Sequence, residues 1–150
     1  MRLYFDCCCY NRPFDDLSQN RIHDKSDAIL SLMNRSKTDG SIILKSTILS
    51  LEIDKIRDIV KRAEVGHLSK IATENIVYNK EIKKRAEEIQ QAALIHVMDS
   101  LHIASAEAGN ADIFLTTDDK LIKACSHIKL NVRVMNPVSY LAEVIENARH

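Results

Sequence analysis

Short apolar runs alternate with longer amphipathic segments along the chain. Runs of this kind, bounded by polar or turn residues, predict buried β-strands. Four are found, at Arg2–Asp6, Ser41–Lys45, Asp112–Thr116 and Val132–Met135. Strands separated by helices are typical of α/β proteins with a mainly parallel central sheet. We therefore expect a three-layer α/β/α fold, and a chain of 150 residues is long enough for one domain spanning residues 1–150.

The segments between these runs carry apolar residues at helical spacing. The expected helices cover about Leu17–Ser36, a long segment after the second strand that ends at Gly66, about Glu74–Ala93, Met98–Ala108, Asp118–Ala124 and a closing helix that reaches about Asn147. Asn136-Pro137 is a typical helix start. Gly109-Asn110 fits a left-handed helix cap, and Asn11–Asp16 is predicted to be a turn or loop.

Composition excludes several classes of protein. The 21 Lys and Arg residues balance 21 Asp and Glu residues, which argues against binding nucleic acid by net charge alone. A local basic rim around an acidic pocket remains compatible with this balance. No run approaches the 18 apolar residues of a membrane helix, and the first residues do not form a signal peptide. We therefore expect a cytoplasmic protein with no membrane partner.

The four cysteines are Cys7, Cys8, Cys9 and Cys125. Their spacing matches no C-x2-C zinc pattern. In a reducing cytosol they are expected to act as small buried apolar residues. A redox role for one of them is the alternative.

Two acidic residues follow predicted strands at the same edge of the sheet. Asp6 ends the first strand, and Asp118 follows the third by one residue. Parallel α/β sheets place their sites beyond the carboxyl ends of the strands. Each Asp alone is also compatible with an ordinary turn or helix start.

Two further acids occupy unusual helical positions. Glu52 lies inside an apolar stripe, where a carboxylate needs a partner, a proton or a metal; an ion pair with Lys55 or Arg57 is the alternative. Asp99 begins a nearly all-apolar helix and is expected to face inward, although a first-turn Asp also favours the helix dipole. His102 is either a packed histidine bonded to the backbone or a residue that shapes a site.

Four carboxylates from two strand ends and two helix faces could converge. Like charges at close range cannot all stay ionised without a cation. An all-oxygen acidic cluster suits Mg²⁺ or Mn²⁺ rather than zinc. Such ions activate water and stabilise the leaving oxygen of a phosphodiester. The hydroxyl groups of Thr116 and Thr117 could orient a metal-bound water.

These residues resemble the motifs of the PIN-domain nucleases, the fold of VapC-type toxins. The matching segments are Leu3–Asp6, Ser46–Glu52, Asp99–Ala106, which fits a D-x-x-H-x-A-x-A helix start, and Ala111–Asp118, which fits a strand followed by T-x-D. Their order and spacing agree over nearly the whole chain. The departures are mild, because Cys7 follows Asp6 where Thr or Ser is usual, and Ser100 and Ser105 replace Ala and Thr.

The resemblance implies a metal-dependent endoribonuclease. Asp6, Glu52, Asp99 and Asp118 would hold one or two Mg²⁺ or Mn²⁺ ions, and Thr116 would support the site. Asp119 is a neighbour that could substitute or assist. The implied substrate is RNA, single-stranded or in a loop. The resemblance also suggests a homodimer, and the toxin half of a toxin–antitoxin pair, in which an antitoxin peptide would cover the acidic pocket.

Basic and polar residues near these acids are candidates for RNA contacts. Asn11 and Arg12 lie just past Asp6, where Arg12 could meet a phosphate; a turn with Arg12 paired to Asp15 or Asp16 is the alternative. A helix could also contribute basic residues to the rim, and the candidates are Arg57, Lys61 and Arg62. The alternative is that these three residues form a solvated helix face.

Two other functional classes compete with this interpretation. A PIN-like scaffold that binds RNA or protein without cutting would be marked by the loss of an acid, and all four are present. A magnesium phosphatase or receiver-like protein would carry a DxD pair or a lysine on a late strand. Asp118 and Asp119 are adjacent, which disfavours that class.

Overall fold

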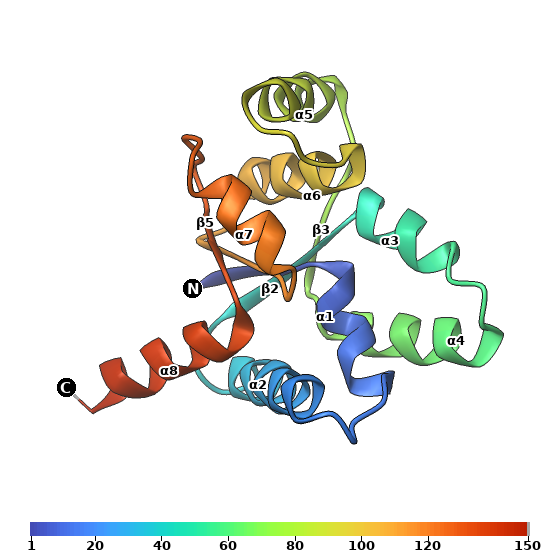
Figure 1. The fold of residues 1–150 in the computed structure, drawn as a ribbon, viewed down its shortest axis with the longest axis vertical. Helices are drawn as coiled ribbons and strands as arrows, with labels where there is room; N and C mark the ends of the chain where they lie inside the picture. The colour runs from blue at the N-terminus through green and yellow to red at the C-terminus, as the bar shows by residue number, and fades with distance from the viewer. Residues whose placement is uncertain (150) are drawn as a thin grey trace.

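The computed structural model describes residues 1–149, in which five parallel strands form one sheet (Figure 1). The strands are β1 (Arg2–Phe5), β2 (Ile42–Ser46), β3 (Glu74–Ile76), β4 (Ile113–Leu115) and β5 (Arg133–Met135). Their order is β3-β2-β1-β4-β5. The chain therefore winds outward from β1 to β3 and then crosses to the other side of β1. Open α/β sheets bind ligands at such a switch point, here between the carboxyl ends of β1 and β4.

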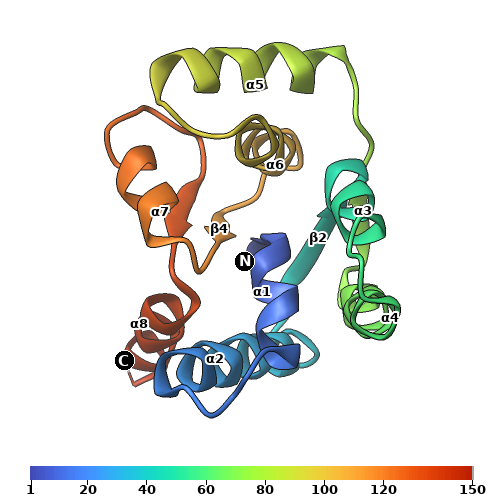
Figure 2. The same ribbon diagram turned by 45° about the vertical axis from the view of Figure 1, so that its right-hand side comes forward.

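Helices cover both faces of the sheet. They are α1 (Cys7–Asn11), α2 (Asn20–Ser36), α3 (Thr47–Asp54), α4 (Ile59–Leu68), α5 (Lys80–Ala92), α6 (Val97–Ala108), α7 (Asp119–Cys125) and α8 (Pro137–Ala148), with 3-10 turns at Arg12–Phe14 and Ser69–Ile71. Helices α2 and α8 pack together on one side, and α5 and α6 on the other (Figures 1 and 2). The three-layer α/β/α prediction is confirmed. Among the described residues, no helix has both the length and the apolar character needed to cross a bilayer.

The central strand divides the core into two layers. Leu3 and Phe5 lie in an apolar cluster with residues of α2, because alternate side chains of a strand point to opposite faces. Tyr4 lies in the other cluster, stacked on Phe114 of β4 at a ring-centroid distance of 5.4 Å, with α6 residues such as Ile103 around it. Burial on both faces explains the continuous apolar character of these strands.

The prediction of one long helix between the second strand and Gly66 is wrong, because this segment forms two helices. The α3 helix ends at Asp54, and α4 begins after Asp58, whose Oδ1 accepts hydrogen bonds from the backbone N–H groups of Val60 and Lys61. This cap satisfies backbone donors that a new helix start leaves free. Val60 is 66% exposed, although the continuous helix predicted it on the buried face.

The helix predicted from Glu74 is also wrong at its start. That segment begins with the edge strand β3, and α5 starts at Lys80 after an Asn79 cap. Glu74 is exposed and pairs with Arg2 at 2.9 Å. An exposed strand of three residues carries no apolar run, so the sequence pattern gave no sign of it.

Gly109 and Asn110, the predicted cap after α6, have different roles. Asn110 adopts the left-handed conformation, with a φ of 55°, and Gly109 does not. Gly109 is instead required for space, because a Cβ atom there would lie 2.4 Å from Ile76 Cδ1 of β3. The small residue lets β3 approach the end of α6.

Two glycine substitutions should change stability in opposite directions. Gly109→Ala should lower the free energy of unfolding by about 1 kcal/mol or more, since Ile76 must move. Gly66→Ala should raise it by about 0.5–1 kcal/mol, since Gly66 lies inside α4 with no atom within 4 Å of the added Cβ. Urea unfolding of both variants checks this pair. Equal stability of Gly109→Ala and the unaltered chain would show that Ile76 adapts freely.

Candidate functional site

The four predicted acids lie around one cavity of about 320 Å³ at the switch point of the sheet. The cavity is lined by Asp6, Cys7, Cys8, Asn11, Glu52, Lys55, Ile56, Asp99 and Asp118. A larger hollow of about 370 Å³, beside α7 and β5, is lined by no carboxylate of the described residues. The acidic cavity is therefore the candidate functional site.

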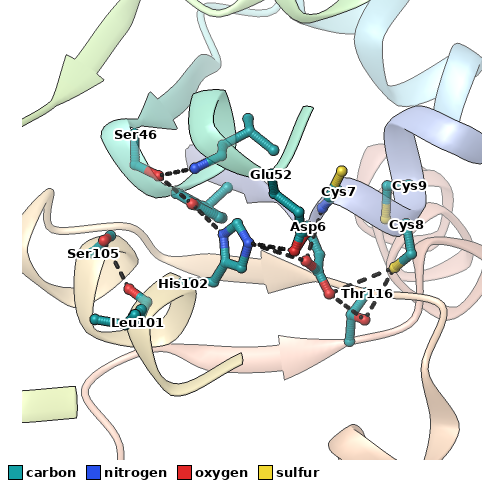
Figure 3. Close-up of polar contacts among 12 residues, drawn as sticks. Asp6, Cys7, Cys8, Cys9, Ser46, Glu52, Leu101, His102, Ser105 and Thr116 are labelled. Carbon is teal, nitrogen blue, oxygen red and sulfur yellow. Dashed lines mark hydrogen bonds and ion pairs between the residues drawn. The ribbon is translucent and has the colours of Figure 1, made fainter. Parts of the chain in front are cut away.

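Asp6 lines this cavity and is held by hydrogen bonds to its neighbours (Figure 3). It directly follows β1 and caps α1, with Oδ1 accepting a hydrogen bond from the Cys7 N–H at 2.8 Å. Its Oδ2 accepts a hydrogen bond from Thr116 Oγ1 at 3.0 Å. Burial raises the pKa of Asp6, against the lowering effect of His102. A carboxylate this enclosed favours either a proton or a cation.

Glu52 and His102 form a pair beside Asp6. The Nε2 atom of His102 lies 3.2 Å from Glu52 Oε1 and 3.9 Å from Asp6 Oδ1. Burial lowers the pKa of His102, but the hydrogen bond to Glu52 and the nearby carboxylates outweigh it, so the pKa is raised. Burial raises the pKa of Glu52, and the His102 interactions reverse this to a net lowering. Glu52 thus takes His102 as its partner, rather than the Lys55 or Arg57 ion pair left open by the sequence.

A buried hydrogen-bond chain supports the imidazole from behind. His102 Nδ1 lies 2.7 Å from Tyr4 Oη, and Tyr4 Oη lies 2.6 Å from Ser46 Oγ. Ser46 Oγ in turn accepts a hydrogen bond from the Leu49 N–H at the start of α3. This chain joins β1, β2 and α6, and it was missed by sequence reasoning. The available signal was the polar tip of Tyr4 in a strand buried on both faces.

Asp99 and Asp118 lie on the open side of the cavity. Burial raises the pKa of Asp99 to about 6, and the charges of Asp6 and Asp118 add to this effect. Asp118 caps α7, with Oδ1 accepting hydrogen bonds from the N–H groups of Lys120 and Leu121. Within the described part of the chain, the tight group of ligand atoms is formed by Asp6, Glu52 and His102, whose atoms all lie within 4.8 Å of one another.

Thr116 joins two of the acids. It donates to Asp6, and its Oγ1 accepts a hydrogen bond from the Asp118 N–H at 3.2 Å. Cys8 Sγ lies 3.4 Å from the same Thr116 hydroxyl and 3.5 Å from Asp6 Oδ2. Cys8 is therefore a half-buried part of the cavity wall. The other three cysteines are buried as predicted, and all four are free thiols.

The neighbouring threonines provide a matched test of this support. Thr116→Val should weaken Mn²⁺ binding by about 10–100-fold, because it removes the hydrogen bond that orients Asp6. Thr117→Val should leave binding nearly unchanged, because the Thr117 hydroxyl is buried without a hydrogen-bond partner. Isothermal titration calorimetry with Mn²⁺ measures both. Equal weakening by the two variants would contradict the role assigned to Thr116.

The remaining predicted residues differ in their placement. Asn11 lines the cavity, whereas Arg12 pairs with Asp15 at 2.6 Å, the alternative that the sequence left open. Lys61 joins the same carboxylate at 2.9 Å. Asp119 is exposed, lies 3.4 Å from Arg21 and is outside the cavity lining.

Two solved structures are similar to this chain over most of its length. One is the VapBC2 complex from Rickettsia felis bound to a DNA fragment from its promoter; the TM-score is 0.62 at 16% identity, covering 91% of this chain and 98% of that chain. The chain has a PIN-like fold. The other is a toxin–antitoxin complex from Klebsiella pneumoniae, with a TM-score of 0.52 at 16% identity, covering 90% and 97%. No family model and no curated protein matches the sequence.

The donor set of this acidic cavity fits a divalent cation. Four carboxylates line the cavity together with Lys55, and the buried His102 lies against two of them, Glu52 and Asp6. Carboxylate oxygens are the preferred ligands of Mg²⁺ and Mn²⁺. A bound cation would relieve the mutual repulsion that helps to raise the pKa of Asp99.

Proposed function

We propose that this protein is a metal-dependent endoribonuclease that hydrolyses RNA phosphodiester bonds. The observation that carries the proposal is the set of four carboxylates around one cavity at the switch point of a PIN-like sheet. Asp6, Glu52, Asp99 and Asp118 would hold one or two Mg²⁺ or Mn²⁺ ions. The bound ion supplies an activated water and stabilises negative charge on the phosphate oxygens.

The chain's own residues then fix the geometry for that chemistry. Thr116 holds Asp6 in one orientation, and the backbone N–H groups of α7 hold one oxygen of Asp118. These contacts keep the acids positioned before substrate arrives, which lowers the cost of reorganisation during the reaction. Lys55 and Asn11 line the cavity, where Lys55 would meet a phosphate and Asn11 a sugar or phosphate oxygen.

An adjoining hollow favours an extended substrate. It measures about 180 Å³, shares Asp99 and Asp118 with the acidic cavity, and is also bordered by His96 and Lys120. A polynucleotide could follow both hollows with its backbone across the acids. Single-stranded or loop RNA suits such an open path, because its backbone is accessible without a duplex partner.

We also propose that the chain is the toxin half of a toxin–antitoxin pair. Both similar structures are toxin–antitoxin complexes. Exposed apolar side chains lie on α3 and α4 near the cavity wall: Leu51 is 49% exposed, Ile59 71% and Val60 66%. A protein partner would cover these apolar side chains. Homodimer formation, a cytoplasmic location and a single domain remain predictions from the sequence.

The test is cleavage of a mixed single-stranded RNA with Mn²⁺ or Mg²⁺. We expect cleavage by the unaltered chain, its loss in EDTA, and its recovery when excess metal is returned. Asp99→Asn should be inactive, and Asp119→Asn should be active, because Asp119 pairs with Arg21 outside the cavity.

The competing function is a PIN-like scaffold that binds RNA or protein without cutting it. RNA binding without cleavage, in a protein that calorimetry shows to be loaded with Mn²⁺, would overturn the nuclease proposal in favour of the scaffold. Cleavage that survives EDTA and Asp99→Asn would place the activity elsewhere or in a contaminant.

A further inference from the structure

We propose that His102 supplies a nitrogen ligand to the metal, so that the site is a mixed nitrogen and oxygen centre that prefers Mn²⁺ to Mg²⁺. This inference rests on the proposed function, since it concerns the same metal site. The sequence pattern assigned the ligands to carboxylates alone. The structure adds an imidazole whose Nε2 atom points at two of them (Figure 3).

The spacing of the three donor atoms fits a shared ion. Adjacent ligands of an octahedral ion lie about 3 Å apart when each is about 2.1 Å from the metal. His102 Nε2 lies 3.2 Å from Glu52 Oε1 and 3.9 Å from Asp6 Oδ1. The ligand atoms of these three described residues all lie within 4.8 Å of one another. The His102 side chain is 0% exposed, so its ring is fixed in this direction by its surroundings.

The hydrogen-bond chain behind His102 is compatible with two proton arrangements of the imidazole, one for the metal-free site and one for the metal-bound site. In one arrangement Ser46 donates to Tyr4 and Tyr4 donates to Nδ1, and the Nε2–H then donates to Glu52. In the other, Nδ1–H donates to Tyr4 and Tyr4 donates to Ser46. Nε2 is then left with a free electron pair facing Glu52 and Asp6.

The second arrangement suits a metal-bound histidine. Without a cation, a lone pair facing two carboxylates is repelled, so the first arrangement or an imidazolium is favoured. With a cation, the lone pair becomes a ligand, and the hydrogen bond from Nδ1 fixes the ring. Nδ1 and Tyr4 Oη keep a hydrogen bond to each other in both cases, so neither buried atom is left unpaired when metal binds.

A nitrogen ligand changes the choice of metal. Mg²⁺ prefers oxygen ligands and keeps several waters, whereas imidazole binds transition metals. We therefore expect Mn²⁺ to bind the unaltered protein more tightly than Mg²⁺. His102→Gln should reduce the ratio of the Mn²⁺ affinity to the Mg²⁺ affinity by about tenfold. Tyr4→Phe should weaken Mn²⁺ binding by about 10-fold but keep the nitrogen ligand, because it removes the hydroxyl that bonds Nδ1 and Ser46 and leaves His102 in place.

The experiment is pulsed electron paramagnetic resonance of the Mn²⁺-loaded protein, which detects nitrogen bonded to the ion. Four samples suffice: the unaltered chain with natural histidine, the unaltered chain with ¹⁵N-labelled histidine, His102→Gln, and His96→Gln as the matched control. His96 lies at the start of the same helix and borders the neighbouring hollow with Asp99. The isotope comparison needs no substitution, so it stands even if His102→Gln fails to fold.

We expect a nitrogen coupling that changes with ¹⁵N-histidine, persists in His96→Gln and disappears in His102→Gln. Bound Mn²⁺ without a histidine coupling would overturn this inference and leave the nuclease proposal intact. Loss of the coupling in His96→Gln would overturn it in favour of His96. Failure of the protein to bind Mn²⁺ at all would overturn both proposals.

Discussion

Asp6→Asn should lower the rate of metal-dependent RNA cleavage by on the order of 10³-fold. A metal ion contributes several kcal/mol of transition-state stabilisation, and each 1.36 kcal/mol corresponds to a factor of ten in rate. Asp6 is only 6% exposed, accepts a hydrogen bond from Thr116 and belongs to the tight donor group with Glu52 and His102. Removing the charge of Asp6 weakens binding of the metal ion and shifts the ion from its catalytic position.

The asparagine variant should nevertheless fold. Its side-chain oxygen can still accept the hydrogen bond from the Cys7 N–H that begins α1. Single-turnover cleavage rates at saturating Mn²⁺ measure the effect, and circular dichroism verifies the fold. Asp119→Asn is the control, because that carboxylate is exposed and outside the cavity. A rate within tenfold of the unaltered chain would remove Asp6 from the catalytic centre.

The placement of the acids was accessible to sequence reasoning because each depends on a local pattern. Asp6 and Asp118 follow apolar strands, and the ends of parallel strands meet at one edge. Glu52 and Asp99 interrupt the apolar faces of helices, which directs them inward. Strand ends and helical periodicity are properties of a few neighbouring residues, so no knowledge of the tertiary contacts was required.

The partners of those acids could not be predicted in this way. His102 meets Glu52 across 50 positions and Tyr4 across 98, and such pairs leave no mark on local periodicity. The edge strand β3 failed for a related reason: it is held by its pairing with β2 and by the Arg2–Glu74 ion pair, with little burial of its own. Long-range contacts decide both features.

Without metal, the Asp99→Asn variant should be more stable than the unaltered chain. With Mn²⁺ present, the variant should be the less stable of the two. The pKa of Asp99 is raised from 3.8 to about 6, by burial and then by the charges of Asp6 and Asp118. Its ionised form therefore opposes folding above about pH 6. Asp99 is half-buried, so solvent screening reduces this cost to about 1 kcal/mol.

The pH dependence follows from the direction of the shift. A raised pKa means that the folded chain binds the proton more tightly than the unfolded chain. The cost is thus complete above about pH 6, shrinks as the pH falls, and vanishes below 3.8, where both states are protonated. In EDTA, the stability advantage of Asp99→Asn should accordingly be largest near about pH 7.5 and close toward about pH 4. The charge of Asp99 also raises the pKa of His102, so the difference between the two proteins includes this coupling.

Metal should reverse the order of the two proteins. At a free Mn²⁺ concentration of 100 times the Kd, the unaltered chain gains about 2.7 kcal/mol, which corresponds to about 5–10 °C in Tm. The variant, with a weaker site, gains only a fraction of this. Thermal unfolding of both proteins, in EDTA and in Mn²⁺ across this pH range, measures the crossover. If the unaltered chain were the more stable of the two in EDTA near about pH 7.5, Asp99 would be a stabilising first-turn residue of α6. Its repulsion by the other acids would then be too weak for a shared metal site.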